Sequence, residues 1–324
     1  MYARIMSGFC GTQALPTSIP SADITHLDSV APTWFKEAFN VDRTEDYAEL
    51  DGVSLHYFRW GNPANPGVVL THGFMAHARC WAFIAPLLAK DYCLVAFDLS
   101  GMGDSGTRPV YEVASRAAEC RAVAEHAGLQ PHPALVCHSY GGSVGLMAVS
   151  DEPDFWGKLI VCDMAMLAPD EPPRFERQRK QELRSEVRPH KVQPTYDAIR
   201  SRFRLAPDQP CENEYLMDYM AFHSTKPVEG GYIWKFDPNI MNRQDDRSED
   251  WWQQIAPNFA ALDIPRGIIY GEHSEMMSPK VIEYLKEQTQ GDVPIVEIKD
   301  AYHHVMLDQP LALAKAIEDL LETL

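Results

Sequence analysis

The sequence predicts an α/β fold, in which helices cover both faces of a mostly parallel, eight-stranded sheet. Short continuous apolar runs recur along the chain, and segments of helical pattern separate them. A turn signal, Asp51-Gly52, joins the first two strand-like runs as a hairpin within residues 47–60. Strands that are apolar throughout are buried on both faces, and parallel strands need crossover connections of helical length.

The expected elements follow one another in a regular order. A short helix is expected over residues 33–39, with Thr33 as its N-cap and an apolar stripe that docks on the core. The buried strands after the hairpin are expected at residues 67–71, 93–98, 134–137, 158–163, 266–271 and 293–298. The helices between and after them are expected at residues 79–89, 111–128, 140–150, 279–289 and 310–323.

The alternation of strands and helices stops between residues 165 and 247. A proline-rich opening and the charged run 174–188 lead there to helix-like segments at 196–203 and 214–223 and an aromatic stretch at 231–236. We therefore expect three parts: an N-terminal extension with a short helix (1–45), a core (46–164 and 248–324) and an insertion (165–247).

The composition is that of a globular protein, with 45% hydrophobic and 23% charged residues among 324. The formal charge of −17 argues against nucleic acid or an anionic membrane surface as a partner. Seven cysteines without a C-x-x-C spacing predict reduced thiols and no structural zinc. The chain has neither a long apolar run nor a signal-peptide core near residue 1, so we expect a cytoplasmic protein without a membrane span.

The most informative segment is residues 134–142, where an apolar run ends at Ser139 and a helix-compatible segment follows. The residues two positions before and after the serine, Cys137 and Gly141, are small. This pattern is typical of a nucleophile elbow, a strained strand-to-helix turn that exposes a serine hydroxyl; Cys137 replaces the usual first glycine.

A second segment supplies the expected oxyanion donors. The strand at 67–71 runs into His72, Gly73 and Phe74. In acyl-transfer enzymes with this elbow, the loop after that strand gives one backbone N–H, and the residue after the nucleophile gives the other. We therefore expect the amides of Phe74 and Tyr140 to form an oxyanion hole.

These motifs, with the strand at 94–98 and a late histidine segment, resemble the α/β-hydrolase family from about residue 47 to the end. The resemblance implies a serine nucleophile, an acid and a late histidine, with a cap inserted after the sixth strand. In the family this histidine lies seven positions before a proline, which selects His303, seven before Pro310, over the adjacent His304. Tyr302 stands at the usual glycine position.

The acid is the point at which the sequence departs from the family. Most members have an aspartate after the seventh strand, where this chain has Ser274. Glu275, one residue further on, is one alternative. In a minority of members, which includes lactonases similar to the zearalenone hydrolases, the acid follows the sixth strand. That position is Asp163, which we favour.

The resemblance implies a cofactor-independent, metal-free serine hydrolase that acts on a small hydrophobic ester or lactone through an acyl-enzyme. The residues expected to contact the substrate are Phe74, Met75, Met164, Trp234 and Phe236, with Tyr215 and Met220 as further candidates in the insertion. C–C bond or thioester hydrolysis, perhydrolysis and a ligand receptor with vestigial activity remain alternatives. The sequence leaves the substrate and the oligomeric state open, a homodimer included.

Overall fold

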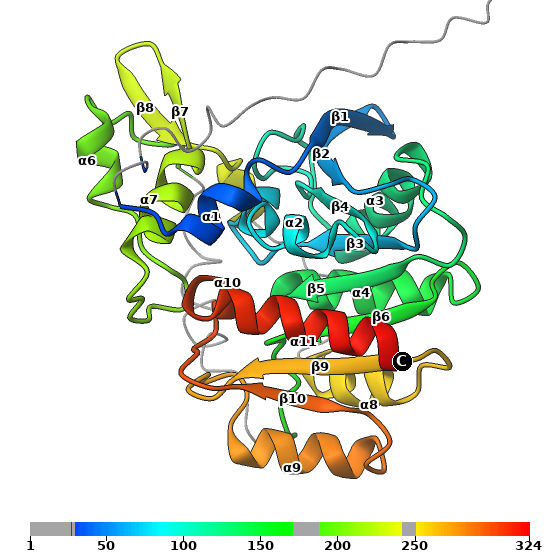
Figure 1. Cartoon of the computed structure of the whole chain (residues 1–324). Coiled ribbons are helices and arrows are strands. Elements are labelled where there is room, and N and C mark those ends of the chain that lie inside the picture. The colour runs from blue at the N-terminus through cyan, green and yellow to red at the C-terminus, as the bar shows by residue number, and fades with distance from the viewer. Residues whose placement is uncertain (1–26, 28–29, 171–187, 242–250) are drawn as a thin grey trace, which may run out of the picture.

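The computed structural model describes residues 27, 30–170, 188–241 and 251–324, which form an eight-stranded sheet with helices on both sides (Figure 1). The strands, in their order across the sheet, are β1 (Arg43–Leu50), β2 (Val53–Trp60), β4 (Cys93–Phe97), β3 (Gly67–Thr71), β5 (Ala134–His138), β6 (Lys158–Cys162), β9 (Arg266–Gly271) and β10 (Ile295–Ile298). β2 pairs antiparallel with both of its neighbours, and the remaining pairs are parallel. The predicted fold class is confirmed.

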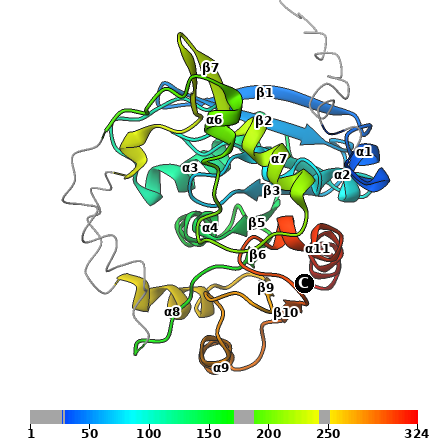
Figure 2. The same ribbon diagram turned by 90° about the vertical axis from the view of Figure 1, so that its left-hand side faces the viewer.

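Two apolar cores lie on opposite faces of the sheet (Figure 2). The first holds residues from α1 (Thr33–Ala38), α2 (Ala85–Leu88) and α11 (Pro310–Thr323). The second holds residues from α3 (Val113–His126), α4 (Tyr140–Asp151), α8 (Ile255–Ala260) and α9 (Pro279–Gln288). Every residue of β3, β4 and β5 is buried, because helices cover both faces of these central strands.

The hairpin turn forms as its sequence predicts. Asp51 and Gly52, which join β1 to β2, have φ angles of 53° and 75°. Two successive residues with positive φ match the right-handed twist of the flanking strands, and glycine accepts this conformation without strain. The turn pairs β1 with β2, and β2 also pairs with β4, so these three strands form the antiparallel side of the sheet.

Two local predictions were wrong. Thr33 is not the N-cap of α1: Pro32 takes that position, and no side chain caps the helix. The helix expected over 79–89 is two short pieces, a 3₁₀ turn η2 (Ala78–Trp81) and α2. Pro86 lies at the start of α2 and lacks the backbone N–H that would continue a helix from η2.

The segment after β6 leaves the core and lies beyond the carboxyl ends of the parallel strands (Figure 1). Its described elements are α6 (Tyr196–Arg200), α7 (Glu214–His223), β7 (Thr225–Val228), β8 (Gly231–Trp234) and η3 (Pro238–Met241). The turn η4 (Trp251–Gln254) then precedes α8. Polar contacts join this segment to the core: the Tyr111 hydroxyl donates to Asp237 Oδ2 at 2.6 Å, and Lys235 Nζ lies 2.8 Å from Asp104 Oδ2.

Several predictions concern residues outside the described part of the chain. They include most of the extension 1–30 and the charged run 174–188 apart from Arg188. The division into extension, core and insertion stays a prediction. Among the helices of the described residues, none has the length and apolar character that crossing a bilayer requires.

Candidate active site

Ser139 lies at the sharp turn between β5 and α4, as the elbow pattern predicts. Its φ of 52° is a strained conformation for a residue with a side chain. The turn needs small neighbours: a Cβ atom on Gly141 would lie 2.6 Å from Thr71 Oγ1 and 2.7 Å from the His72 carbonyl oxygen. Cys137 fits two residues before the serine because Gly145 of α4 leaves room for its sulfur.

The ring of His303 lies between Ser139 and Asp163. His303 Nε2 is 2.9 Å from Ser139 Oγ, and His303 Nδ1 is 2.7 Å from Asp163 Oδ1. The three residues come from three places: the end of β5, the end of β6 and the loop between β10 and α10 (Val305–Asp308). His303 and Asp163 are buried, so water competes little for these hydrogen bonds.

Asp163 is held by two further donors, one from the end of β9 and one from the loop that follows it. The Gly271 amide donates to Asp163 Oδ2 at 2.9 Å, and the Ser274 hydroxyl donates to Asp163 Oδ1 at 2.5 Å. Sequence reasoning treated Ser274 only as a missing aspartate and did not foresee this contact. The available signal was the pairing of adjacent strands, since β9 lies beside β6 and the two loops share one edge.

Glu275, the alternative acid, is not a hydrogen-bond partner of the His303 ring in the described structure. Its side chain is exposed, one residue beyond the buried Ser274. Both ring nitrogens of His303 already lie within hydrogen-bond distance of Asp163 and Ser139. The structure therefore brings Asp163 to the histidine, and Glu275 has no ring nitrogen left to bind.

The loop that carries Phe74 lies against the elbow. A Cβ atom on Gly73 would lie 3.3 Å from the Cβ of Ser139, so this loop approaches the serine closely. Buried His72 fixes the loop: its Nδ1 donates to the Gly73 carbonyl at 2.8 Å, and its Nε2 accepts the Leu99 amide at 3.0 Å. Burial lowers the pKa of His72, which keeps the ring neutral, as this donor–acceptor pattern requires.

The side chains of the two expected oxyanion residues also pack together. The rings of Phe74 and Tyr140 meet edge to face with centroids 5.6 Å apart. Arg116 of α3 donates to the Tyr140 hydroxyl at 2.8 Å and to the Ser100 carbonyl at 2.8 Å. The start of α4, which bears the Tyr140 amide, is thereby anchored beside the loop of Phe74.

A recess opens beside Phe74 and His138, between the core and the described part of the segment that follows β6, residues 188–241 (the inserted segment). Most of its lining is apolar: Phe74, Met75, Ala76, Cys80, Phe203, Leu205, Ala206, Met220, Met306 and Leu307, with His138, Arg204, Ser224 and His304 as polar members. Phe74, Met75 and Met220 were expected from the sequence. The others come from η2, β5, α10 and several loops, and no local pattern marks them as facing a cavity.

Four of the expected contact residues do not line this recess. Met164 packs beneath α4, where its sulfur would lie 2.6 Å from a Cβ atom on Gly142. Phe236 forms a backbone bridge with Met102, and Tyr215 packs on Phe35 with ring centroids 5.2 Å apart. Trp234 of β8 packs near Phe203 instead.

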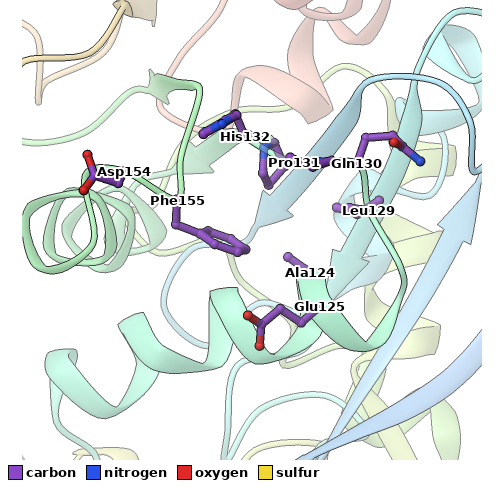
Figure 3. A pocket seen from close by; sticks show the side chains of 9 residues that line it. Ala124, Glu125, Leu129, Gln130, Pro131, His132, Asp154 and Phe155 are labelled. Carbon is purple, nitrogen blue, oxygen red and sulfur yellow. The ribbon is translucent and has the colours of Figure 1, made fainter.

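Another recess, of about 530 Å³, lies at the other end of β5 (Figure 3). Its lining includes residues 129–133, which precede β5, and Phe155, whereas Ser139 follows β5. The five residues of that strand separate the recess from the serine by about 16 Å. This recess is therefore not part of the candidate active site.

Two groups of side chains in the described part of the chain could offer ligands to a metal ion. In the first, His56, Asp98 and Asp104, both ring nitrogens of the histidine already bind carboxylates. The second, Glu272, His273 and Asp300, is exposed, and Lys299 lies 3.0 Å from Glu272. Neither group includes Ser139, His303 or Asp163.

Comparisons with known proteins agree with this architecture. An uncharacterized hydrolase of Bacillus subtilis (strain 168) is 29% identical over 126 residues, which make up 38% of this chain and 46% of that protein. The chain thus spans less than half of that relative. A monoacylglycerol lipase of Xenopus laevis is 24% identical over 294 residues, 86% of this chain and 82% of the lipase.

Among solved structures, the thioesterase domain from the curacin biosynthetic pathway superposes with a TM-score of 0.69 at 23% identity. The superposition covers 85% of this chain and 99% of that domain, and at this identity it shows a common fold. Residues 68–316 match the family described as the alpha/beta hydrolase family. That match spans most of the sequence, and the chain therefore belongs to the alpha/beta hydrolase family.

Proposed function

We propose that this protein is a serine hydrolase that cleaves a carboxylic ester or a lactone through an acyl-enzyme intermediate. The observation that carries the proposal is the continuous hydrogen-bonded series from Ser139 Oγ through the His303 ring to Asp163, at 2.9 and 2.7 Å. A hydroxyl, an imidazole and a carboxylate in this order are the components of nucleophilic acyl transfer.

The proposed reaction begins with attack of Ser139 Oγ on the substrate carbonyl carbon. His303 Nε2 accepts the serine proton, while Asp163 holds the proton on Nδ1 and stabilises the imidazolium. The amides of Phe74 and Tyr140 would bind the oxyanion. The tetrahedral intermediate then collapses, the leaving oxygen takes the proton from Nε2, and an acyl-serine remains. Water, deprotonated by His303, releases the acid.

The apolar recess beside Phe74 supports a hydrophobic substrate. Most of its lining residues are apolar, so it offers an acyl chain or a ring system mainly apolar contacts. We propose that the inserted segment acts as a cap, because Phe203, Leu205 and Met220 close one side of this recess. A cap that excludes water strengthens the electrostatic interactions within the site.

A series of p-nitrophenyl esters of increasing acyl length, with a lactone beside them, tests the proposal. Wild-type protein should turn over at least one of them, and Ser139→Ala should reduce kcat by about 10⁴-fold or more. A fluorophosphonate probe should label wild type and leave Ser139→Ala unlabelled.

The matched control is Ser201→Ala, since Ser201 is an exposed serine whose hydroxyl donates only to the nearby Ala198 carbonyl. It should label and turn over like wild type. A wild-type protein that neither labels nor hydrolyses any of these substrates would contradict the proposal. Labelling without ester turnover would point to another acyl substrate, such as a thioester.

A further inference from the structure

The backbone around His303 is held by side chains from outside its own loop. The buried ring of His138, at the end of β5, lies with Nε2 2.9 Å from the His303 carbonyl oxygen. Burial holds the pKa of His138 well below its usual value, so the ring is neutral and Nε2–H donates to that carbonyl. On the other side of His303, the Tyr302 amide donates to Asp308 Oδ2 at 2.8 Å.

The inserted segment holds the other side of the peptide group that joins His303 to His304. The His304 amide donates to Gln209 Oε1 at 2.9 Å, and Gln209 Nε2 donates to Asp308 Oδ2 at 2.9 Å. Gln209 thus binds the His304 amide and also the Asp308 carboxylate, which accepts the hydrogen bond from the Tyr302 amide. Asn213, at the start of α7, adds contacts from Nδ2 to the Leu307 carbonyl at 2.8 Å and the Asp308 carbonyl at 3.0 Å.

We propose that Gln209 is a positioning residue that sets the place of the His303 ring relative to Ser139. The inference rests on the proposed function, in which His303 transfers the proton. It assigns the inserted segment a second role: besides covering the recess, the segment completes the support of the histidine. Proton transfer between Ser139 and His303 depends on the distance between the serine oxygen and the ring nitrogen. A misplacement of a catalytic group by about 1 Å can lower the rate by about 100-fold.

The expected effect falls on kcat, with little change in KM. Gln209 is absent from the described residues that line the recess, so its loss should leave substrate binding nearly intact. Replacing the side chain with an apolar one leaves the His304 amide and one Asp308 oxygen lone pair without this partner. The loop can then move, and we expect a fall in kcat of roughly tenfold to 100-fold.

Gln209→Met is the variant of choice, since methionine keeps the length of glutamine and removes both hydrogen bonds. Its matched control is Gln193→Met: Gln193 is also in the inserted segment, and its Nε2 donates only to the Lys191 carbonyl at 3.3 Å. Both variants are assayed in the full-length protein with the best p-nitrophenyl ester, and rates are referred to the concentration of fluorophosphonate-labelled serine. That reference counts only folded sites, so partial unfolding does not obscure the result.

We expect Gln209→Met to lose about tenfold or more in kcat per labelled site with KM within about twofold, and Gln193→Met to match wild type. An unchanged kcat, or a change confined to KM, would overturn the inference and leave the proposed function standing. Equal losses in both variants would overturn it as well. If Ser139→Ala remains as active as wild type, the proposed function fails, and this inference fails with it.

Discussion

Two buried histidine–aspartate pairs in the described part of the protein are nearly identical in the hydrogen bond between the Nδ1 atom and the carboxylate. His303 Nδ1 lies 2.7 Å from Asp163, and His56 Nδ1 lies 2.8 Å from Asp98. They differ at the second ring nitrogen. His303 Nε2 meets the hydroxyl of Ser139, whereas His56 Nε2 meets the carboxylate of Glu45 at 2.8 Å.

The second partner decides what each ring can do. Burial disfavours a charged His56, but its hydrogen bonds to Asp98 and Glu45 outweigh that effect and raise the pKa of His56 to about 9. At neutral pH both of its nitrogens therefore donate, and the ring has no lone pair to accept a proton. A ring between a carboxylate and a hydroxyl keeps such a lone pair. The contrast teaches that a histidine–aspartate pair becomes a candidate active site only through its third partner.

The largest expected effect is on kcat, and it should follow substitution of Asp163 but not of Asp98. Asp163→Asn should lower kcat by about 10⁴-fold, because asparagine can hold the ring of His303 in the wrong tautomer and cannot stabilise the imidazolium. Steady-state hydrolysis of the best p-nitrophenyl ester measures this loss.

Two matched variants test the assignment. Asp98→Asn, in the other pair, should leave kcat per folded molecule within about threefold, and exposed Glu275→Gln should leave it within about twofold. If Glu275→Gln is the damaging change and Asp163→Asn is mild, the acid of the proposed mechanism is Glu275.

The second prediction concerns stability. His56→Gln leaves Asp98 and Glu45 without their shared cation, and breaking a buried ion pair in this way costs about 3–5 kcal/mol in the free energy of unfolding. Urea denaturation measures it. The control His273→Gln, at an exposed histidine 4.0 Å from Glu272, should change stability by less than about 0.5 kcal/mol. A loss equally small in His56→Gln would mean that the pair adds nothing to the fold.

The third prediction is a pH dependence of the same pair. The pKa of His56 is raised from 6.5 to about 9, so its contribution is fully present below pH 6.5 and is lost as the pH rises through 9. The shift corresponds to about 3 kcal/mol of unfolding free energy. Urea denaturation at a series of pH values from 6 to 10 should show that the free energy of unfolding of wild type declines. The decline should be smaller in His56→Gln. Parallel curves for the two proteins would refute the assignment.

The smallest expected effect tests how Asp163 is supported. Ser274→Ala removes one donor to Asp163 Oδ1 but leaves the Gly271 amide in place. A single hydrogen bond to a charged group corresponds to roughly tenfold to 150-fold in rate. The remaining donor places the expected loss in kcat near the lower limit. A loss of 10³-fold or more would show that Ser274 acts in the reaction directly.

Much of the fold was predictable because its signals are local. A fully apolar run such as β3, and a turn such as Asp51-Gly52, depend on residues close together in the chain. The strained turn at Ser139 is equally local, since it requires small residues within two positions. The interruption between η2 and α2 is harder to predict, because residues 79–89 are mostly apolar and a single proline, Pro86, is the local signal of a break.

Patterns within short segments of the sequence were enough to predict the fold class and the order of the elements, and to select Ser139 and His303 as candidates. Three features depend on how distant segments pack: the carboxylate that reaches His303, the hydrogen bond from Ser274 to Asp163, and the contact of Gln209 with the histidine loop. The physical reason is distance along the chain. Asp163 and Ser274 are brought together by the pairing of β6 with β9, and Gln209 meets His304 through the packing of the inserted segment on the core. No pattern within one segment carries that information.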